Sequence, residues 1–306
     1  MYPLKFAPVY QERIWGGTNL KRVFDRDIPG DHIGESWDLS SHSNGMSIVK
    51  NGFLAGKSLK ELIAEYQEKL MGKKFTGEKS FPLLVKILDA NDDLSIQVHP
   101  DDEYARKTEG EAGKAEAWYV VHAKEGAHII YGLNNEVTRE TFIAAVNGHR
   151  IGDVIRKVSV KPGDMIYVPA GTVHALMKGV MVYEVQQNSD TTYRIYDYDR
   201  VGNDGKPREL HITKALEVIQ FTEQPGCVFT EPCIQCQYFS MEKISVNGSA
   251  DEKTQNQFII YCVITGSGEI CYNESRESLE AGDTVLVPAC LDTFTLTGNL
   301  SLLKIT

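Results

Sequence analysis

The sequence has no long apolar run. Nowhere in its 306 residues is there a stretch approaching the roughly 18 apolar residues that a membrane-spanning helix needs. Pro3, Lys5, Pro8 and Gln11 interrupt the N-terminal segment before the apolar core of a signal peptide could form. These absences predict a cytoplasmic protein with no membrane partner.

Positive charge is also scarce. The chain has 32 Lys and Arg against 42 Asp and Glu, which gives a formal net charge of −10. A field of this sign repels phosphate backbones and anionic lipids, so nucleic acids and membrane surfaces are excluded as default partners. Hydrophobic residues make up 42% and charged residues 24%, ordinary values for a globular protein, which excludes a chain that stays disordered.

Cysteine is sparse and unevenly placed. All six cysteines lie in the last third of the chain, at positions 227, 233, 236, 262, 271 and 290. Cys233 and Cys236 form a Cys-x-x-Cys pair, but it has neither the second pair nor the two histidines of a closed zinc site. We therefore expect structural thiols rather than a metal or disulfide framework.

Most of the chain consists of short runs rich in Val, Ile, Tyr and Thr, separated by Gly, Pro, Asn and Asp. This pattern is typical of an all-β barrel or sandwich. Helical spacing of apolar residues occurs in only three segments, 58–71, 138–147 and 212–219. Ser58 and Thr138 are predicted N-caps, and a capping box is expected only at Ser58, where a glutamate occupies the third helical position.

An internal repeat indicates a duplicated architecture. Residues 161–174 align with residues 280–293, and residues 118–126 resemble residues 260–268. The matched positions are Gly163 with Gly282, Asp164 with Asp283, and Pro169 with Pro288. His174 is replaced by Thr293 in the second copy, so only the first copy is expected to keep its ligand chemistry.

The first copy has the pattern Gly-x5-Pro-x-Gly-x2-His, from Gly163 to His174. It resembles the second sequence motif of the cupin, or jelly-roll, superfamily. The chain is therefore interpreted as mainly β, with two cupin barrels and a small helical insertion. We expect a catalytic, metal-binding cupin domain with helical elements at residues 1–225 and a second, metal-free cupin domain at residues 226–306, with a junction near residues 220–232.

Candidate metal ligands follow strand periodicity. Ser95, Gln97 and His99 are two residues apart, so on a strand their side chains project from one face. Lys114 and Glu116 show the same period at the start of an apolar strand.

His174 completes a set of two imidazoles, one carboxylate and one amide. This set suits Zn²⁺ or another divalent first-row ion, with a position left for water or substrate. His122 shares the parity of Glu116 but lies about 20 Å further along an extended strand, so we do not expect it to reach the same ion. His128 is a similarly weak competitor.

Further motifs extend the likeness over most of the chain. They are a Trp-Gly-Gly at 15–17, Ile-Gly-Glu-Ser-Trp at 33–37, the run at 82–90, Gln-Val-His-Pro-Asp-Asp at 97–102, Lys-x-Glu at 114–116, Gly-x-x-His-Ala at 171–175 and Gln-Asn-Ser-Asp-Thr-Thr-Tyr-Arg at 187–194. In this order they resemble type I mannose-6-phosphate isomerases in their short bacterial form. The family often has Lys-Pro-Glu where this chain has Lys-Ala-Glu, and its longer members carry a larger helical insert.

The resemblance implies a ligand set for one zinc ion per chain, namely Gln97, His99, Glu116 and His174. It further implies that Arg194 is the active-site arginine, that Lys114 matches a lysine of the family, and that Ser95 lies near the substrate phosphate. The implied reaction is the zinc-dependent interconversion of mannose 6-phosphate and fructose 6-phosphate, by proton transfer between C1 and C2 through an enediol or enediolate.

The side-chain chemistry of these residues favours the same roles in substrate binding and proton transfer. An anionic sugar phosphate approaching an acidic protein needs local cations, and Lys114 and Arg194 are the predicted ones. The competing interpretation of Arg194 is a surface arginine paired with Asp190 or Asp197. Glu184, on an apolar run at 182–185, is a candidate proton carrier. Lys114, Arg194 and Glu184 are thus the catalytic candidates, and the group that moves the proton stays open.

Two other functions fit parts of the pattern. A non-catalytic sugar-phosphate-binding cupin would keep the barrel without the chemistry. A metal-dependent cupin oxygenase is the other alternative, because two histidines and one carboxylate also suit Fe(II). A small-molecule sugar phosphate is the expected partner, and either a monomer or a homodimer is compatible with the sequence.

Overall fold

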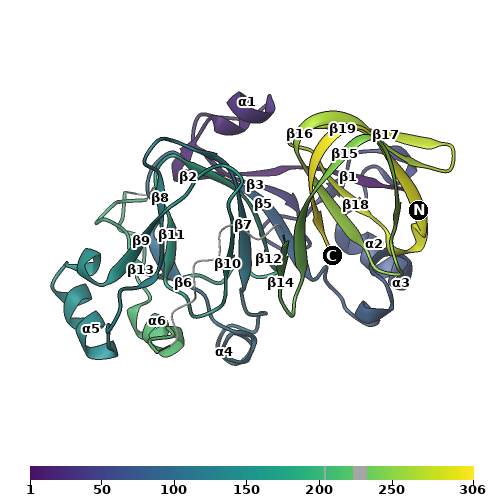
Figure 1. The fold of residues 1–306 in the computed structure, drawn as a ribbon. Helices are drawn as coiled ribbons and strands as arrows, with labels where there is room; N and C mark the ends of the chain where they lie inside the picture. Colours follow the sequence, from purple (N-terminus) through teal and green to yellow (C-terminus); the bar gives the residue numbers. More distant parts are fainter. Residues whose placement is uncertain (203–204, 223–232) are drawn as a thin grey trace.

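The structure is a computed structural model that describes residues 1–202, 205–222 and 233–306 (Figure 1). It is mainly β, as the sequence predicts, and its strands form three antiparallel sheets. The six-stranded and five-stranded sheets lie together in one half of the molecule, and the eight-stranded sheet forms the other half. The predicted boundary at residues 225 and 226 lies outside the described residues, so the domain division stays a prediction.

The two sheets of the first half are built from residues 9–196. The six-stranded sheet has the order β10-β7-β12-β5-β3-β2. Its strands are β2 (Val9–Gly17), β3 (Ile33–Leu39), β5 (Leu83–Ala90), β7 (Glu116–Ala123), β10 (Met165–Val168) and β12 (Val180–Gln187). The five-stranded sheet has the order β13-β6-β11-β8-β9. Its strands are β6 (Ile96–Val98), β8 (His128–Leu133), β9 (Ile155–Ser159), β11 (His174–Leu176) and β13 (Tyr193–Tyr196).

The eight-stranded sheet takes strands from both ends of the chain. Its order is β14-β15-β19-β16-β18-β1-β4, with β17 paired to β16. The strands are β1 (Leu4–Ala7), β4 (Ile48–Val49), β14 (Cys233–Gln235), β15 (Ser240–Lys253), β16 (Ile259–Tyr272), β17 (Ser275–Glu280), β18 (Thr284–Val287) and β19 (Thr293–Ile305). Leu4 pairs with Leu286, so the N-terminal strand belongs to the sheet of the C-terminal half.

Short helices decorate this framework. They are α1 (Asn19–Phe24), α2 (Leu59–Tyr66), α3 (Glu68–Met71), α4 (Asp102–Thr108), α5 (Arg139–Asn147) and α6 (Ile212–Val218), with 3₁₀ turns η1 (Gly52–Leu54), η2 (Lys73–Phe75), η3 (Ile151–Asp153) and η4 (Ala289–Leu291). The three predicted helical segments are confirmed, although Gln67, at φ 41°, separates α2 from α3. Sequence periodicity misses α1 and α4, which have only 6 and 7 residues. Among the described residues, no helix has the length and apolar character needed to cross a membrane.

The capping prediction is half right. Ser58 and Glu61 form the expected capping box at the start of α2. A second box is present at α5, where the Thr138 backbone N–H donates to Thr141 Oγ1 at 2.9 Å and the Thr141 N–H donates to Thr138 Oγ1 at 3.2 Å. The expectation of a single box was therefore wrong, because a threonine hydroxyl at the third helical position can also accept the N-cap N–H.

The internal repeat is visible as one turn built twice. Gly163 and Gly282 both have left-handed backbones, with φ of 95° and 90°, which a glycine adopts without strain. Their N–H groups donate to the carbonyls of Val120 and Val263, respectively. Val120 is thus equivalent to Val263, whereas the alignment of 118–126 with 260–268 pairs it with Cys262. The upstream alignment is off by one residue.

Strand alternation gives the five-stranded sheet an apolar outer face, while its inner face carries both apolar side chains, such as Leu176, and the polar site residues. Ile96 and Val98 pack in a cluster with Phe142 of α5 and Ala215 of α6, so the helices cover the outer face. Gln97, between them, therefore projects to the opposite, inner face. The inner face looks toward the six-stranded sheet, and the site described below lies between the two sheets.

Arg26 links the two halves of the molecule. Its guanidinium donates to both carboxylate oxygens of Asp38, at 2.8 and 2.6 Å, and to the carbonyl of Gly282 in the C-terminal half. Thr284 Oγ1 donates to the same carboxylate at 2.9 Å. The Asp38 side chain is only 3% exposed, so these partners take the place of water around its carboxylate.

Removal of the guanidinium should destabilise the whole protein. In Arg26→Ala, the buried Asp38 carboxylate loses its charged partner, and we expect the free energy of unfolding to fall by about 3 kcal/mol or more. Urea unfolding followed by circular dichroism measures this loss. Lys57→Ala, which breaks an exposed pair with Glu65, is the control and should have little effect. Equal unfolding midpoints for the two variants would contradict the linking role of Arg26.

Candidate metal centre and adjoining cleft

Three of the predicted residues lie in one row across the five-stranded sheet. His174 of β11 is directly opposite Gln97 of β6, and Gln97 is directly opposite Arg194 of β13. Directly paired residues point to the same face of a sheet. The register therefore places an imidazole, an amide and a guanidinium side by side on the inner face.

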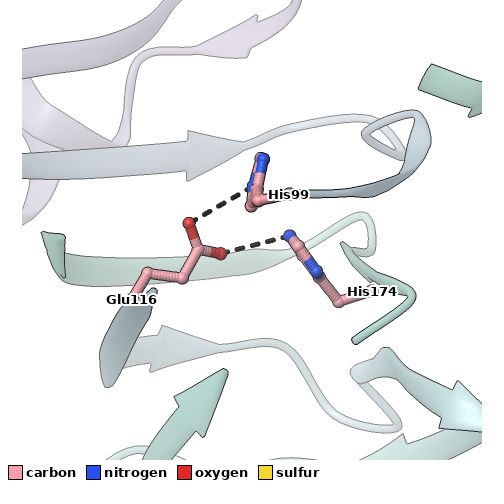
Figure 2. A group of neighbouring side chains, drawn as sticks. All are labelled: His99, Glu116 and His174. Atoms are coloured by element: carbon pink, nitrogen blue, oxygen red, sulfur yellow. Dashed lines mark ion pairs between the residues drawn. The ribbon is translucent and has the colours of Figure 1, made fainter. Parts of the chain in front are cut away.

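His99, Glu116 and His174 converge in the interior (Figure 2). The His99 Nε2 atom is 3.4 Å from Glu116 Oε2, and the His174 Nε2 atom is 3.1 Å from Glu116 Oε1. The two imidazole ring centroids are 4.8 Å apart. All three side chains are 1% exposed, and their candidate ligand atoms lie within 4.8 Å of one another.

Backbone carbonyls fix the tautomers of both histidines. His99 Nδ1 is 2.9 Å from the Thr191 carbonyl, and His174 Nδ1 is 2.8 Å from the Thr172 carbonyl. A carbonyl only accepts, so each Nδ1 must carry the hydrogen and each Nε2 presents a lone pair toward Glu116. This is the usual outer-shell arrangement of metal-ligating histidines.

The cluster fits a cation because buried acceptor atoms converge in it. The His99 Nε2 atom and both Glu116 carboxylate oxygens are buried and have no hydrogen-bond partner within the described part of the chain. Buried polar atoms without partners are rare and costly, and here they all point to one spot. Two nitrogen donors and a carboxylate, fully desolvated, make up the type of donor set that a divalent transition metal prefers.

The protonation states of the cluster also suit the binding of a metal ion. Burial and, after it, the nearby Lys114 ammonium outweigh the opposing effect of Glu116 and lower the pKa of His99 to about 3, so the imidazole is neutral. Burial tends to raise the pKa of Glu116, but Lys114 and the two histidines outweigh it and hold that pKa well below its usual value. Neutral imidazoles and an ionised carboxylate are the forms that bind metals.

Gln97 and Ser95 adjoin the cluster on β6 and the residue before it. The Gln97 Nε2 atom is 3.4 Å from His174 Nε2, and the Ser95 hydroxyl is 3.4 Å from Gln97 Oε1. The amide nitrogen of Gln97 thus faces the histidine. A half-turn of the amide would present its oxygen to the cluster at the same place.

Lys114 and Glu184 come from the opposite side of the site. Lys114 Nζ is 3.6 Å from Glu116 Oε2, and the lysine is buried. Glu184 of β12 accepts a hydrogen bond from Trp118 Nε1 at 2.9 Å. Burial and the charge of Glu116 raise the pKa of Glu184. A buried carboxyl with a raised pKa is suited to exchange protons.

A lysine that no sequence motif indicated lies beside Glu184. Lys86 of β5 is directly opposite Glu184, and its ammonium lies 3.6 Å from both Glu184 Oε1 and Glu35 Oε2 and 4.7 Å from the Trp37 ring centroid. Burial lowers the pKa of Lys86, but the two carboxylates outweigh it and raise that pKa. The available signal was a lysine inside an otherwise apolar strand.

Five of the predicted residues share one cleft of about 460 Å³. Ser95, Gln97, Lys114, Glu184 and Arg194 all line it. Residues that the sequence did not single out also line it, including Arg13, Glu35, Lys86, Asp190, Arg208 and His211. His99, Glu116 and His174 do not line the cleft, and they adjoin it through their contacts with Gln97 and Lys114.

The structure gives Arg194 a different environment from an ordinary surface ion pair. Asp197 pairs with Arg200 and Arg208 instead, and Asp190 accepts a hydrogen bond from Asn44. Within the described ranges, no carboxylate pairs with Arg194. Its Nη1 group donates to the Glu209 carbonyl at 2.9 Å, and its buried Nε group has no hydrogen-bond partner among the residues that the structure describes.

The weaker histidine candidates lie elsewhere. The His122 Nε2 atom is 3.3 Å from the Arg22 guanidinium. Neither His122 nor His128 belongs to the cluster of His99, Glu116 and His174, which we call the metal-type cluster. His211 was not expected at the site, yet it lines the cleft, and its Nδ1 atom accepts from the Arg194 backbone N–H at 3.2 Å. His211 lies outside every recognised motif, so no sequence pattern indicated that it would line the cleft.

Comparisons with known proteins agree with the motifs. A model of the type I phosphomannose isomerase catalytic domain matches residues 3–115, and a model of the mannose-6-phosphate isomerase cupin domain matches residues 230–306. The mannose-6-phosphate isomerase ManA of Bacillus subtilis (strain 168) is 46% identical over 307 residues, which cover 97% of this chain and 96% of the relative. The mannose-6-phosphate isomerase of Streptococcus mutans is 39% identical over 313 residues, 98% of this chain and 97% of the relative.

A solved structure shows the same fold. The crystal structure of the mannose 6-phosphate isomerase from Bacillus subtilis superimposes with a TM-score of 0.93 at 40% identity, and the match covers 100% of both chains. Together with the cupin-domain match, this confirms the predicted mainly β cupin class. The likeness extends over the whole chain and is not confined to the metal-type ligands.

Acid should weaken the buried network behind the cleft. Burial tends to raise the pKa of Glu35, but Lys86 and Arg13 outweigh it and lower that pKa from 4.5 to about 2. As the pH falls below 4.5, the unfolded chain therefore binds a proton at Glu35 while the folded protein does not. The stabilisation by ionised Glu35 is complete above pH 4.5 and is lost as the pH falls toward 2. We expect wild type to lose about 2 kcal/mol more than Glu35→Gln between pH 6 and pH 3. Urea unfolding across this range tests it, and parallel pH profiles would refute it.

Proposed function

Because the chain belongs to the type I phosphomannose isomerase family and is therefore an isomerase, we propose that it interconverts mannose 6-phosphate and fructose 6-phosphate with bound zinc. The observation that carries the proposal is the buried cluster of His99, Glu116 and His174, in which unpaired acceptors converge beside a cleft lined with cationic side chains. The relatives named mannose-6-phosphate isomerase match nearly the whole chain, which supports the choice of substrate.

The metal would be held by His99, Glu116 and His174, with Gln97 as a fourth ligand, at one zinc per chain. When bound, zinc would act as a Lewis acid that stabilises negative charge developing on substrate oxygens. Gln97 and the two imidazoles are neutral, so the ligand set carries a single formal negative charge. The site thus keeps a net positive charge for an anionic intermediate.

The substrate would be oriented by Ser95, Lys114 and Arg194, all of which line the cleft. Lys114 is buried beside Glu116, where a cation interacts strongly because little water screens it. Arg194 offers an Nε–H without a partner and can bind oxygens of the substrate in two-point fashion. These cations offset the repulsion between an acidic protein and an anionic sugar phosphate.

Isomerisation requires moving a proton between C1 and C2, and we assign this task to Glu184. Burial and Glu116 favour its protonated form, whereas Lys86 and the Trp118 N–H favour the carboxylate. These opposing influences make the two protonation states more nearly equal in energy, which is what a group that both accepts and returns a proton needs. The proton would leave one carbon as an enediol or enediolate forms and return to the other.

The C-terminal half would serve as a metal-free packing partner. Thr293 stands where the first copy has His174. The interior of the eight-stranded sheet is filled by apolar side chains, among them Tyr261, Phe294, Leu296 and Leu302. A residue range of 226–306 for this domain remains part of the proposal.

Metal removal tests the proposed function directly. Purified protein should interconvert the two sugar phosphates, lose this activity after chelation and recover it when zinc is added. Glu116→Gln removes the only anionic ligand and should lower zinc affinity, measured by chelator competition, by more than the 10–100-fold that outer-shell changes typically cost. Glu125→Gln, on the exposed turn after β7, is the control and should behave as wild type. Metal-replete, folded protein without turnover would refute the proposal.

Glu184→Gln tests the proton carrier. The amide keeps a similar shape but cannot exchange the proton, so kcat should fall by about 100-fold or more. Deuterium uptake from D₂O at the substrate C2, followed by NMR, should fall in parallel, while the Kd for mannose 6-phosphate changes little. Glu12→Gln is a matched control because Glu12 lines the same cleft at an exposed position. Unchanged isotope exchange in Glu184→Gln would assign the proton transfer to another residue.

A further inference from the structure

Asp197 holds two arginines at one end of the cleft. Its carboxylate accepts hydrogen bonds from Arg208 Nε at 2.7 Å and from Arg208 Nη2, and from Arg200 Nη2 at 2.8 Å. The Asp197 side chain is only 5% exposed. A buried carboxylate with two guanidinium partners is an element of rigid local structure, because each arginine is held at two or more points.

The two arginines point to different places. Arg200 Nη1 donates to the Asp93 carbonyl at 2.6 Å, and its guanidinium carbon lies 4.9 Å from the Tyr198 ring centroid. Arg200 is therefore engaged by the protein on all sides and does not line the cleft. Arg208 lines the cleft, with its Nε edge held against Asp197.

Arg194 supplies a second guanidinium to the same end. Its Nη1 group donates to the carbonyl of Glu209, the residue after Arg208, and its backbone N–H donates to His211. Burial and, after it, the proximity of Arg208 lower the pKa of Arg194. In the described part of the chain, Asp197 pairs with Arg200 and Arg208, Asp92 lies 3.8 Å from Arg200, and no carboxylate pairs with Arg194, so three guanidinium groups have two carboxylate partners. Two cations thus face the cleft with an excess of positive charge, which favours an anion between them.

We propose that Arg208, positioned by Asp197, binds the phosphate of the sugar phosphate together with Arg194. This inference rests on the proposed function and adds a phosphate-recognition residue that no motif indicated. The anion is a phosphomonoester, whose oxygens match the planar, multi-donor geometry of guanidinium groups.

The position along the cleft suits a hexose 6-phosphate. Arg194 is one strand from Gln97 and two strands from His174, which puts its backbone about 10 Å from that of the metal-type ligand. A phosphate at this end leaves the rest of a six-carbon chain extending toward Gln97, Lys114 and the metal-type cluster. Arg200 is bonded to Asp93, two residues before Ser95, so Ser95 lies toward the same end.

Asp197 would act as a positioning residue. By holding Arg208 before substrate arrives, it reduces the side-chain entropy that binding would otherwise remove. It also leaves free the edge of the Arg208 guanidinium that is not bonded to the carboxylate. Loss of Asp197 should therefore weaken phosphate binding without altering the groups near the metal-type cluster.

Steady-state kinetics of Arg208→Ala and Arg200→Ala test the proposal, because both arginines pair with Asp197 but only Arg208 lines the cleft. Arg208→Ala should raise KM for mannose 6-phosphate by about 10–100-fold, the usual effect of losing a charge-assisted hydrogen bond, with kcat within about threefold of wild type. Arg200→Ala should leave KM within about threefold. Arg208→Lys should restore part of the loss, and Asp197→Asn should raise KM less than Arg208→Ala does. Equal KM values for wild type and Arg208→Ala would overturn the proposal.

Calorimetric binding of inorganic phosphate to the metal-free protein separates this inference from the proposed function. Wild type should bind phosphate at least 10-fold more tightly than Arg208→Ala, whether or not the protein isomerises a sugar. If wild type binds phosphate through Arg208 but turns over neither sugar phosphate, the isomerase proposal fails and the phosphate site stands. If the two proteins bind phosphate equally while wild type is active, the phosphate site fails and the isomerase proposal stands. If Arg208→Ala does not fold, Arg208→Gln supplies the same comparison, because it removes the positive charge and keeps most of the side-chain length.

Discussion

The structure depends on one electrostatic constraint, the burial of several lone pairs around a common point. His99 Nε2 and His174 Nε2 both face the Glu116 carboxylate at 3.1–3.4 Å, and the His99 nitrogen and both carboxylate oxygens have no hydrogen-bond partner among the described residues. Such a cluster is costly unless a cation occupies it, because buried acceptors lose their water without gaining hydrogen bonds. The carbonyls of Thr172 and Thr191 hold the rings in the required tautomer. The local backbone thus holds both histidines in the form that a metal site requires.

The two sheets of the first half contribute different chemistry to the space between them. The five-stranded sheet provides a row of His174, Gln97 and Arg194, which runs from the metal-type cluster toward the proposed phosphate site. The six-stranded sheet provides a row of directly paired residues, Trp118, Glu184, Lys86 and Trp37. A slip of one residue in either register would turn its row to the outside. Strand register is therefore what couples folding to the chemistry of the site.

Duplication has preserved geometry without preserving chemistry. Both copies keep the glycine turn and its hydrogen bond to the neighbouring strand, at Gly163 and at Gly282. The second copy has Thr293 at the histidine position and an apolar interior, and it pairs with β1 at the N-terminus through Leu4 and Leu286. Arg26 adds a polar connection between the halves. A shared fold therefore says little about function until the side chains inside it are examined.

The sequence alone determined what short-range patterns can encode. Period-two spacing placed Gln97 and His99 on one face, the cupin motif identified His174, and capping and helical spacing located α2, α5 and α6, because these features depend on residues close together in the chain. It could not pair Trp118 with Glu184, 66 residues away, or aim Lys86 between two carboxylates. It also gave no sign that Asp197 holds Arg208 toward the cleft while Arg194 stays without a carboxylate partner among the described residues. Those contacts follow from strand register and loop packing, which the tertiary structure alone decides, because they join segments with no local signal for each other.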